Sequence, residues 1–183
     1  MKSYKVKDMM VPLSEYATVH DDATLYEAVL SLEKAQAEFH QSSYRHRAIL
    51  VLSKENKVIG KISQLDVLKA LEPKYNEMLN GHGLHHFGFT NNFMKSMLKE
   101  YRLFENSMEN LCKKAAEQNV KNFMYTPSQG EYIDANATLD VATHQLVVGR
   151  HQSLLVTEDS GIIGVLRLTD VFTAVYQTMR ACC

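Results

Sequence analysis

The sequence predicts an α/β fold of the α+β type, in which two copies of a β-α-β-β-α unit pack as a pseudo-two-fold pair. The main observation is a repeated segment: VIGKISQLDVLKAL (58–71) and IIGVLRLTDVFTAV (162–175) share five identical and four apolar-for-apolar positions out of fourteen. Two further pairs of similar segments follow in the same order: 6–10 with 120–124, and 21–28 with 135–142. Similar segments that recur in the same order are typical of a duplicated unit, and two such units imply a symmetric pair with facing clefts.

The elements of the first copy follow from its apolar pattern. Helical spacing begins at Leu25, where Thr24 and Glu27 are the residue types of a capping box. The run AILVL is continuous and apolar, as in a strand that is buried on both faces. The predicted order is strand 17–19, a helix from Leu25, strand 48–52, strand 58–62 and helix 65–71, which Pro73 ends.

The second copy follows the same plan with fewer residues. Its predicted elements are strand 131–134, helix 139–148, strand 154–157, strand 162–166 and helix 170–179. Thr24 and Thr138 are 114 residues apart, whereas Gly60 and Gly164 are 104 apart, so the first copy carries ten extra residues. We place these within 34–45, where they most simply extend a helix or loop on the surface.

Three regions result: residues 1–72, a helical linker over 73–119, and residues 120–183. The linker is too long to be a bare loop in a compact domain. From Phe93 to Ala115 apolar residues recur at three- and four-residue spacing, which predicts one helix over 92–117. At ~1.5 Å per residue this helix is about 39 Å long. Its apolar stripe must pack against the repeats or against another subunit.

Composition excludes several classes of protein. With 20 basic and 21 acidic residues, the chain lacks the basic character of a nucleic-acid-binding domain. No apolar run approaches the roughly 18 residues that a membrane span needs. The first residues lack the apolar core of a signal peptide, and three cysteines are too few for a disulfide framework. We therefore expect a cytoplasmic protein that contacts neither nucleic acid nor membrane.

The duplicated pattern resembles a tandem pair of cystathionine β-synthase (CBS) domains. Val6, Asp8 and Met10 are similar to the opening of that domain. HRAILVLSKENKVIGKISQLDVLKAL (46–71) resembles its most distinctive half, and RHQSLLVTEDSGIIGVLRLTDVFTAV (150–175) matches nearly as well. The resemblance implies two β-α-β-β-α units whose clefts bind adenosine nucleotides such as AMP, ADP or ATP. It also implies a disc-like homodimer with a regulatory, energy-sensing role.

The segment Ser63-Gln64-Leu65-Asp66 lies at a predicted strand-to-helix junction, where free backbone N–H groups favour an anion. A serine hydroxyl there can donate to a phosphate, and the Asp66 carboxylate can accept both hydroxyls of a ribose. In the family the matching acid binds ribose and the matching Ser or Thr lies near phosphate. A helix capping box is the structural alternative for the same two residues.

In the second copy Arg167 replaces the serine, whereas Asp170 is kept and Thr169 precedes it. An acid that is kept without its capping partner indicates a separate task, and this favours ribose binding. Arg167 departs from the family pattern. Either its planar guanidinium contacts phosphate, or its bulk fills the cleft and leaves one working site.

Basic residues precede the buried strand in both copies: His46 and Arg47 in the first, Arg150 and His151 in the second. In some CBS proteins residues at this place reach phosphates across the central axis; solvated charges are the alternative. Backbone groups and apolar walls near the first strand of each copy would hold adenine. The candidates for this role are Thr18, Val19, Tyr132 and Ile133.

No motif indicates catalysis. Gly-x-Ser-x-Gly, phosphate-loop and dinucleotide-binding motifs are missing from the sequence. His82, His85 and His86 cluster without a nearby carboxylate or cysteine, so we expect neither a metal site nor a required cofactor. We expect a non-enzymatic module that binds an adenosine nucleotide and signals to an unknown protein partner. A ligand-free scaffold that dimerises through its helices is the alternative.

Overall fold

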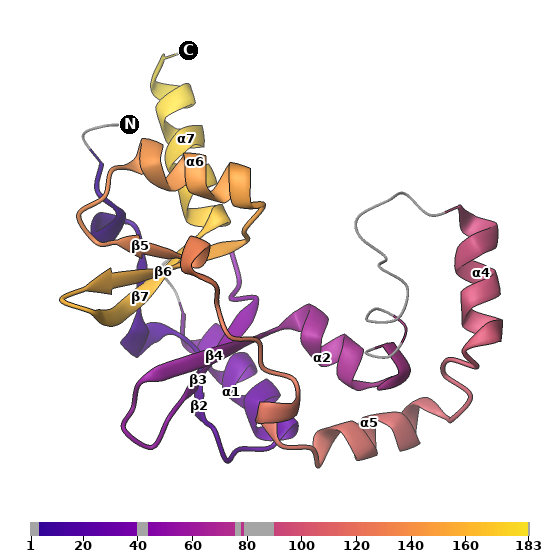
Figure 1. Ribbon diagram of the computed structural model, residues 1–183. Helices are drawn as coiled ribbons and strands as arrows, with labels where there is room; N and C mark the ends of the chain where they lie inside the picture. The colour runs from indigo at the N-terminus through magenta and orange to yellow at the C-terminus, as the bar shows by residue number, and fades with distance from the viewer. Residues whose placement is uncertain (1–3, 40–43, 76–77, 79–89, 183) are drawn as a thin grey trace.

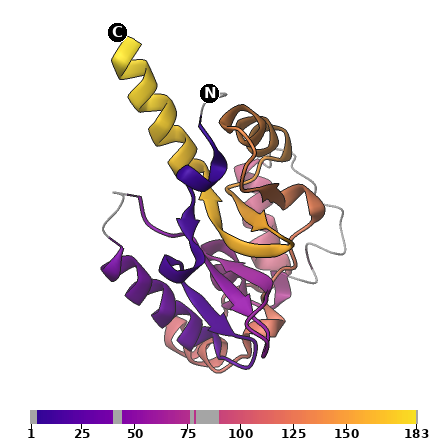
Figure 2. The same ribbon diagram turned by 90° about the vertical axis from the view of Figure 1, so that its left-hand side faces the viewer.

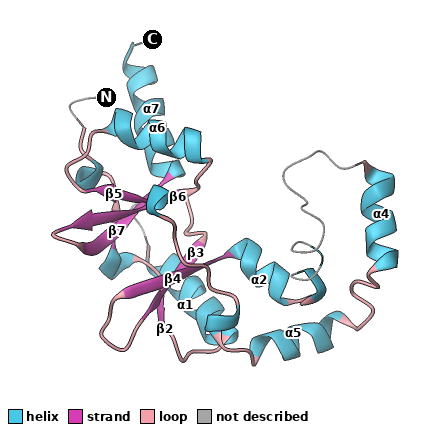
Figure 3. Ribbon diagram, in the orientation of Figure 1, coloured by secondary structure: helices cyan, strands magenta, loops and turns pink. Residues whose placement is uncertain are grey.

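The computed structural model describes residues 4–39, 44–75, 78 and 90–182, and it places the two copies in two separate sheets (Figure 1). The first copy contains β2 (Thr18–His20), α1 (Leu25–Glu38), β3 (Ala48–Leu52), β4 (Val58–Ser63) and α2 (Gln64–Ala70). The second contains β5 (Tyr132–Asp134), α6 (Leu139–Gly149), β6 (Ser153–Glu158), β7 (Gly161–Arg167) and α7 (Leu168–Cys182). The predicted β-α-β-β-α order is confirmed in both copies, and Figure 3 shows the alternation.

The two sheets have the same internal pairing. In the first, β2 runs parallel to β3, and β3 is antiparallel to β4. In the second, β5 runs parallel to β6, and β6 is antiparallel to β7. The predicted capping box at the start of α1 is confirmed, since the Glu27 amide donates to the Thr24 hydroxyl and Glu27 accepts from the Thr24 amide.

Each copy sends its leading segment to the sheet of the other copy. The short strand β1 (Val11–Pro12) precedes the first copy but pairs antiparallel with β7 of the second. In the same way, Tyr125 at the start of the second copy forms an antiparallel bridge with Lys61 on β4 of the first. The Val6 amide donates to the Ala137 carbonyl, and the Val120 amide donates to the Ala23 carbonyl, both at 3.0 Å. This reciprocal exchange makes the two copies one interlocked structure.

Glycine is required where the exchanged segments cross the sheets. A Cβ added to Gly164 would lie 2.5 Å from the Val11 carbonyl oxygen and 2.9 Å from the Met10 sulfur. A Cβ added to Gly60 would lie 2.8 Å from the Met124 sulfur. The repeated glycine therefore has a packing role in both copies, because it lets a neighbouring chain segment approach the strand closely.

The core has one cluster per copy and one between the sheets. Ile49, Val51 and Ile62 belong to the first copy's cluster, and Leu154, Val156 and Leu166 belong to that of the second. The cluster between the sheets joins both copies through Val11, Tyr16, Leu50, Leu155 and Val165. Every one of these side chains is buried, and at about 25 cal/mol per Å² the apolar area of the cluster between the sheets is the main attraction that joins them.

The insertion in the first copy lengthens α1 and places residues beyond it. α6 ends at Gly149, followed by the left-handed Arg150 (φ 53°), whereas α1 continues to Glu38 with Phe39 as its C-cap. One part of our placement is wrong. Strand register pairs Ala48 with Ser63 and Ser153 with Arg167, so one of the ten extra residues lies in the β3–β4 turn instead.

The predicted single helix over 92–117 is also wrong. Two helices, α4 (Asn91–Glu100) and α5 (Met108–Ala116), are separated by a turn in which Arg102 and Phe104 have positive φ. The buried Glu72 carboxylate accepts a 2.8 Å hydrogen bond from the Phe104 amide, which fixes this turn. α5 packs on the first copy, with Ala115 in its core, whereas α4 lies away from both sheets (Figure 1).

α7 projects beyond the second sheet, as Figure 2 shows. It exposes the large side chains Phe172, Tyr176 and Met179. Among the helices in the described ranges, none combines the length and apolar character that a membrane span requires.

Candidate functional site

A cleft of about 350 Å³ opens between the two copies, and we call it the central cleft. Its lining residues come from both copies: Tyr16, Arg45, Arg47, Ala48, Lys61, Ser63, Gln64, Leu65, Gln152, Ser153, Arg167, Leu168 and Thr169. Four of them are cationic, and none is acidic. The structure thus brings the predicted residues Arg47, Ser63, Arg167 and Thr169 together around one space. Such a cleft suits a small ligand that carries negative charge.

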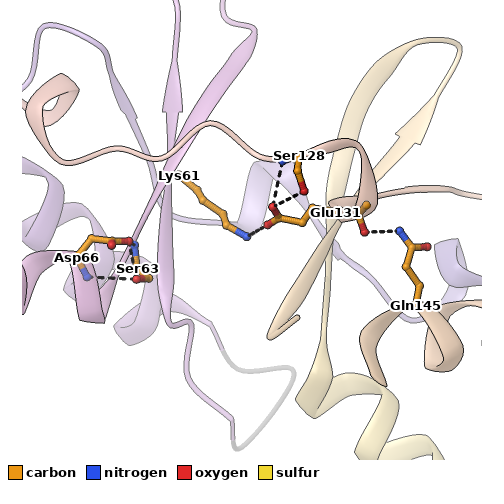
Figure 4. A network of polar contacts seen from close by, with 7 residues as sticks. Lys61, Ser63, Asp66, Ser128, Glu131 and Gln145 are labelled. Atoms are coloured by element: carbon orange, nitrogen blue, oxygen red, sulfur yellow. Dashed lines mark hydrogen bonds and ion pairs between the residues drawn. The ribbon is translucent and has the colours of Figure 1, made fainter. Parts of the chain in front are cut away.

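At the start of α2, Ser63 and Asp66 form a reciprocal capping box (Figure 4). Asp66 Oδ2 accepts from the Ser63 amide at 2.9 Å and from the Ser63 hydroxyl at 2.6 Å, while the Asp66 amide donates to Ser63 Oγ. The second carboxylate oxygen lies 3.5 Å from Lys69 Nζ. One Asp66 oxygen therefore holds the helix start, and the other makes the long contact with Lys69.

At the start of α7, Arg167 and Asp170 form a buried ion pair. The Arg167 amide donates to Asp170 Oδ2 at 2.9 Å, and the guanidinium donates to both carboxylate oxygens through Nε and Nη2. Nη1 donates to the Tyr44 carbonyl at 2.9 Å, and the guanidinium carbon lies 5.1 Å from the centre of the Phe39 ring. Since Arg167 is 5% exposed, its charge is neutralised inside the protein rather than presented to solvent.

The two predicted histidines lie in different surroundings. His46 is fully buried between the rings of Tyr16 and Phe39, with centroid separations of 4.6 and 4.5 Å. Burial, followed by the nearby Arg167 charge, lowers the pKa of His46 to about 4. His151 packs beside Gly149 at the end of α6 and is not among the residues that line the central cleft.

The four predicted adenine-wall residues are not equally accessible. Thr18 lines a second pocket, of about 430 Å³, between β2 and α1. Val19 and Ile133 pack into the cores of their copies, and Tyr132 packs against the core between the sheets. The carbonyls of Thr18 and Tyr132 accept equivalent 2.9 Å hydrogen bonds, from Ser31 and Gln145, so the two first strands are held alike.

Comparison with known proteins agrees with this geometry. A family model described as the CBS domain matches residues 6–73 and 120–177, which is more than half of the chain. The chain belongs to the CBS domain family. A search of curated proteins found no match.

Solved structures with the same arrangement include CBS-pair proteins. A CBS domain-containing protein from Bacillus anthracis is 18% identical with a TM-score of 0.63, over 96% of this chain and 95% of that one. The CBS-pair protein CBSX2 from Arabidopsis thaliana is 20% identical with a TM-score of 0.59, over 97% of both chains. A structure of CBSX2 in complex with AMP is 18% identical with the same TM-score, over 96% and 98%. At these identities the likeness establishes the CBS-pair fold.

One ion pair between the CBS repeats is not apparent from the motif. Lys61 Nζ lies 2.5 Å from Glu131 Oε2, and the other Glu131 oxygen accepts from the Ser128 amide and hydroxyl (Figure 4). Lys61 also lies 5.2 Å from the Tyr125 ring centre. At the equivalent positions the other repeat has Val165 and Ala17, so comparing the two copies residue by residue is the signal that would have indicated this pair.

In the described part of the chain, no group of three or more His, Cys, Asp or Glu side chains is placed to hold a metal ion. His82, His85 and His86 lie outside the described residues.

Proposed function

We propose that this CBS pair is a regulatory module that binds an adenosine nucleotide, AMP, ADP or ATP, with its phosphates in the central cleft. The observation that carries the proposal is the lining of this cleft. Arg45, Arg47 and Lys61 lie at one space with the Ser63 and Thr169 hydroxyls. A phosphate dianion is bound well by several cations and hydroxyl donors at once, since each charge-assisted hydrogen bond contributes roughly 1.5–3 kcal/mol.

The sugar is assigned to Asp66. One of its oxygens holds the helix start, and the other lies next to Lys69 at 3.5 Å, a contact long enough for ribose hydroxyls to replace it. The walls for adenine remain those predicted near Thr18, Val19, Tyr132 and Ile133. The AMP bound to CBSX2, which shares this fold, supports the choice of ligand.

Signal transfer is assigned to the contacts that join the repeats. A ligand phosphate beside Lys61 competes with Glu131 for the same ammonium group, so binding alters an ion pair that joins the two CBS repeats. A change in their relative orientation would then reach a protein partner.

Calorimetric titration with AMP, ADP, ATP and S-adenosylmethionine tests the proposal. We expect at least one adenosine compound to bind, and Arg47→Gln to weaken it about 10- to 100-fold because one charge-assisted contact is lost. Arg180→Gln, which removes an exposed cation from the last turn of α7, is the matched control and should bind as the wild type does. No binding of any adenosine compound would refute the proposal.

A second candidate function is a dimerising scaffold. An apolar groove of about 570 Å³ lies between α2 and the α4–α5 region, lined by residues such as Leu65, Leu68, Met94 and Leu98. Together with the exposed face of α7, this favours association of two chains as a homodimer. Light scattering decides the oligomeric state. Thermal shift separates the functions, since a ligand near 100 times its Kd adds about 2.7 kcal/mol of apparent stability.

A further inference from the structure

The cleft that faces Asp170 is divided in two by residues of the first-repeat insertion. On one side is the 430 Å³ pocket between β2 and α1, which includes Tyr16, Ala17 and Thr18. On the other side is a pocket of about 370 Å³ that includes Arg167, Asp170 and Tyr44. Phe39 lines both pockets. The aromatic ring therefore lies between the place predicted for the nucleobase and the acid predicted for the ribose.

Phe39 is held there by specific contacts. Its ring lies 5.1 Å from the Arg167 guanidinium carbon and 4.5 Å from the His46 ring. Tyr44, on the far side of the insertion, accepts a hydrogen bond from Arg167 through its carbonyl. Arg167 thus contacts two residues of the insertion, Phe39 and Tyr44, as well as Asp170, and cation–π attraction favours the closed position of the ring.

The other repeat has no equivalent of this closure. α6 ends with Gly149 and the left-handed Arg150, so the chain turns directly toward β6 without an inserted aromatic residue. Within the described residues, the α6–β6 connection therefore gives the Asp66 side no counterpart of Phe39, although the acid itself is repeated.

We infer that Phe39 is a gate that competes with ligand for the Asp170 cleft, so that an adenosine nucleotide binds there only after the ring withdraws. This rests on the proposed function and adds regulation to it. When the Phe39 ring is in place, the chain binds one nucleotide, through the central cleft and Asp66. A second nucleotide binds at Asp170 with an affinity reduced by the fraction of chains in which the gate is open.

His46 gives the gate an internal reporter. In the closed state it is shielded by Phe39 and Tyr16, and the charged groups that act on it are Arg167 and Asp170, with the Glu15 backbone as a further contact. When the ring withdraws, water reaches the imidazole, and its pKa rises from about 4 toward the ordinary value of 6.5.

The test is calorimetric titration with AMP of the wild type, Phe39→Ala, and Tyr26→Ala as a control that removes an exposed aromatic ring from the same helix. We expect one AMP per chain for the wild type and the control. Phe39→Ala should bind two, or bind the second at least tenfold more tightly. Adding Asp170→Asn to Phe39→Ala should abolish the second event. Phe39→Leu, which is milder for folding, should give an intermediate affinity.

The outcomes separate the two proposals. If the wild type binds one AMP and Phe39→Ala binds it identically, the gate is refuted and the proposed function stands. Two equally tight sites in the wild type also refute the gate. If no variant binds any adenosine compound, both fail. Histidine NMR on the wild type is a second readout: with excess AMP the pKa of His46 should rise, and an unchanged value at two AMP per chain contradicts the gate.

Discussion

The two repeats place an acid at the same point of the fold and surround it differently. Asp66 and Asp170 each accept a 2.9 Å hydrogen bond from the amide three residues earlier. In the first repeat the cap is a small hydroxyl, whereas in the second it is Arg167, whose guanidinium donates to the carboxylate. The shared backbone bond explains why both acids suit the fold, and the residue at the cap determines whether a hydroxyl or a buried guanidinium bonds the carboxylate.

The largest expected effect is at the second acid. Arg167→Met leaves Asp170, whose side chain is 10% exposed, without its counter-ion, and breaking such a pair costs about 3–5 kcal/mol of unfolding free energy. Urea denaturation measures this loss. Arg167→Met combined with Asp170→Asn should recover most of it, because no buried charge is then left. A loss below about 1 kcal/mol would show that the carboxylate is solvated.

A pH effect of similar size is expected from His46. Its pKa is lowered to about 4 in the folded chain and is ordinary when unfolded, so the unfolded state binds the proton more readily. The stabilisation is complete above about pH 6.5 and is lost as pH falls toward 4, by up to about 3 kcal/mol at 1.36 kcal/mol per unit. His46→Phe keeps an aromatic ring in place and should flatten this part of the unfolding curve. Equal slopes for both chains would contradict the assignment.

A smaller difference in stability is expected at the two glycines where the leading segment of one repeat crosses the sheet of the other. At Gly164 an added methyl group meets the Val11 carbonyl, which cannot move independently of β1, so Gly164→Ala should cost about 1–3 kcal/mol. At Gly60 the same change meets the Met124 side chain, which is flexible, and should cost less than about 1 kcal/mol. Chemical denaturation of both variants compares them. If Gly60→Ala cost more than Gly164→Ala, the chain crossing at Gly164 would be the more loosely packed of the two.

The smallest effect is expected at the first cap. Ser63→Ala removes the hydroxyl that accepts from the Asp66 amide, and losing an N-cap costs about 1 kcal/mol. Thermal unfolding detects a change of this size. Ser63→Thr keeps the hydroxyl and serves as the control. If Ser63→Ala were as damaging as Arg167→Met, the contrast drawn between the two caps would be wrong.

Local patterns predicted the elements because the forces that form them act over a few residues. The strand 48–52 coincides with β3, and the capping box at Thr24 and Glu27 is present as predicted. Because the second repeat has the same sequence pattern, its elements could be predicted in the same way, and α6 begins at Leu139 as expected. Of the twelve predicted site residues, the central cleft is lined by Arg47, Ser63, Arg167 and Thr169.

Contacts between distant residues account for the errors. The helix over 92–117 breaks because Glu72, far away in sequence, accepts from the Phe104 amide. The insertion was expected on the surface, yet Phe39 and the Tyr44 carbonyl both contact the buried Arg167. The Arg167 guanidinium is bonded to Asp170 and to the Tyr44 carbonyl, while the choice between its two predicted roles stays a prediction. Neither Phe39 nor Tyr44 can be inferred to be a partner of Arg167 from the spacing of residues in the sequence.

The crossing of leading segments also constrains how this chain is made. β1 leaves the ribosome well before its pairing partner β7, since Val11 lies opposite Val165. At 5–20 residues per second the nascent strand waits roughly 8–30 seconds for that partner, with its edge unpaired. Native pairing over such a separation also makes folding slow, because a large loop must close first. Chaperone protection during synthesis is thus most valuable for the unpaired edge of β1.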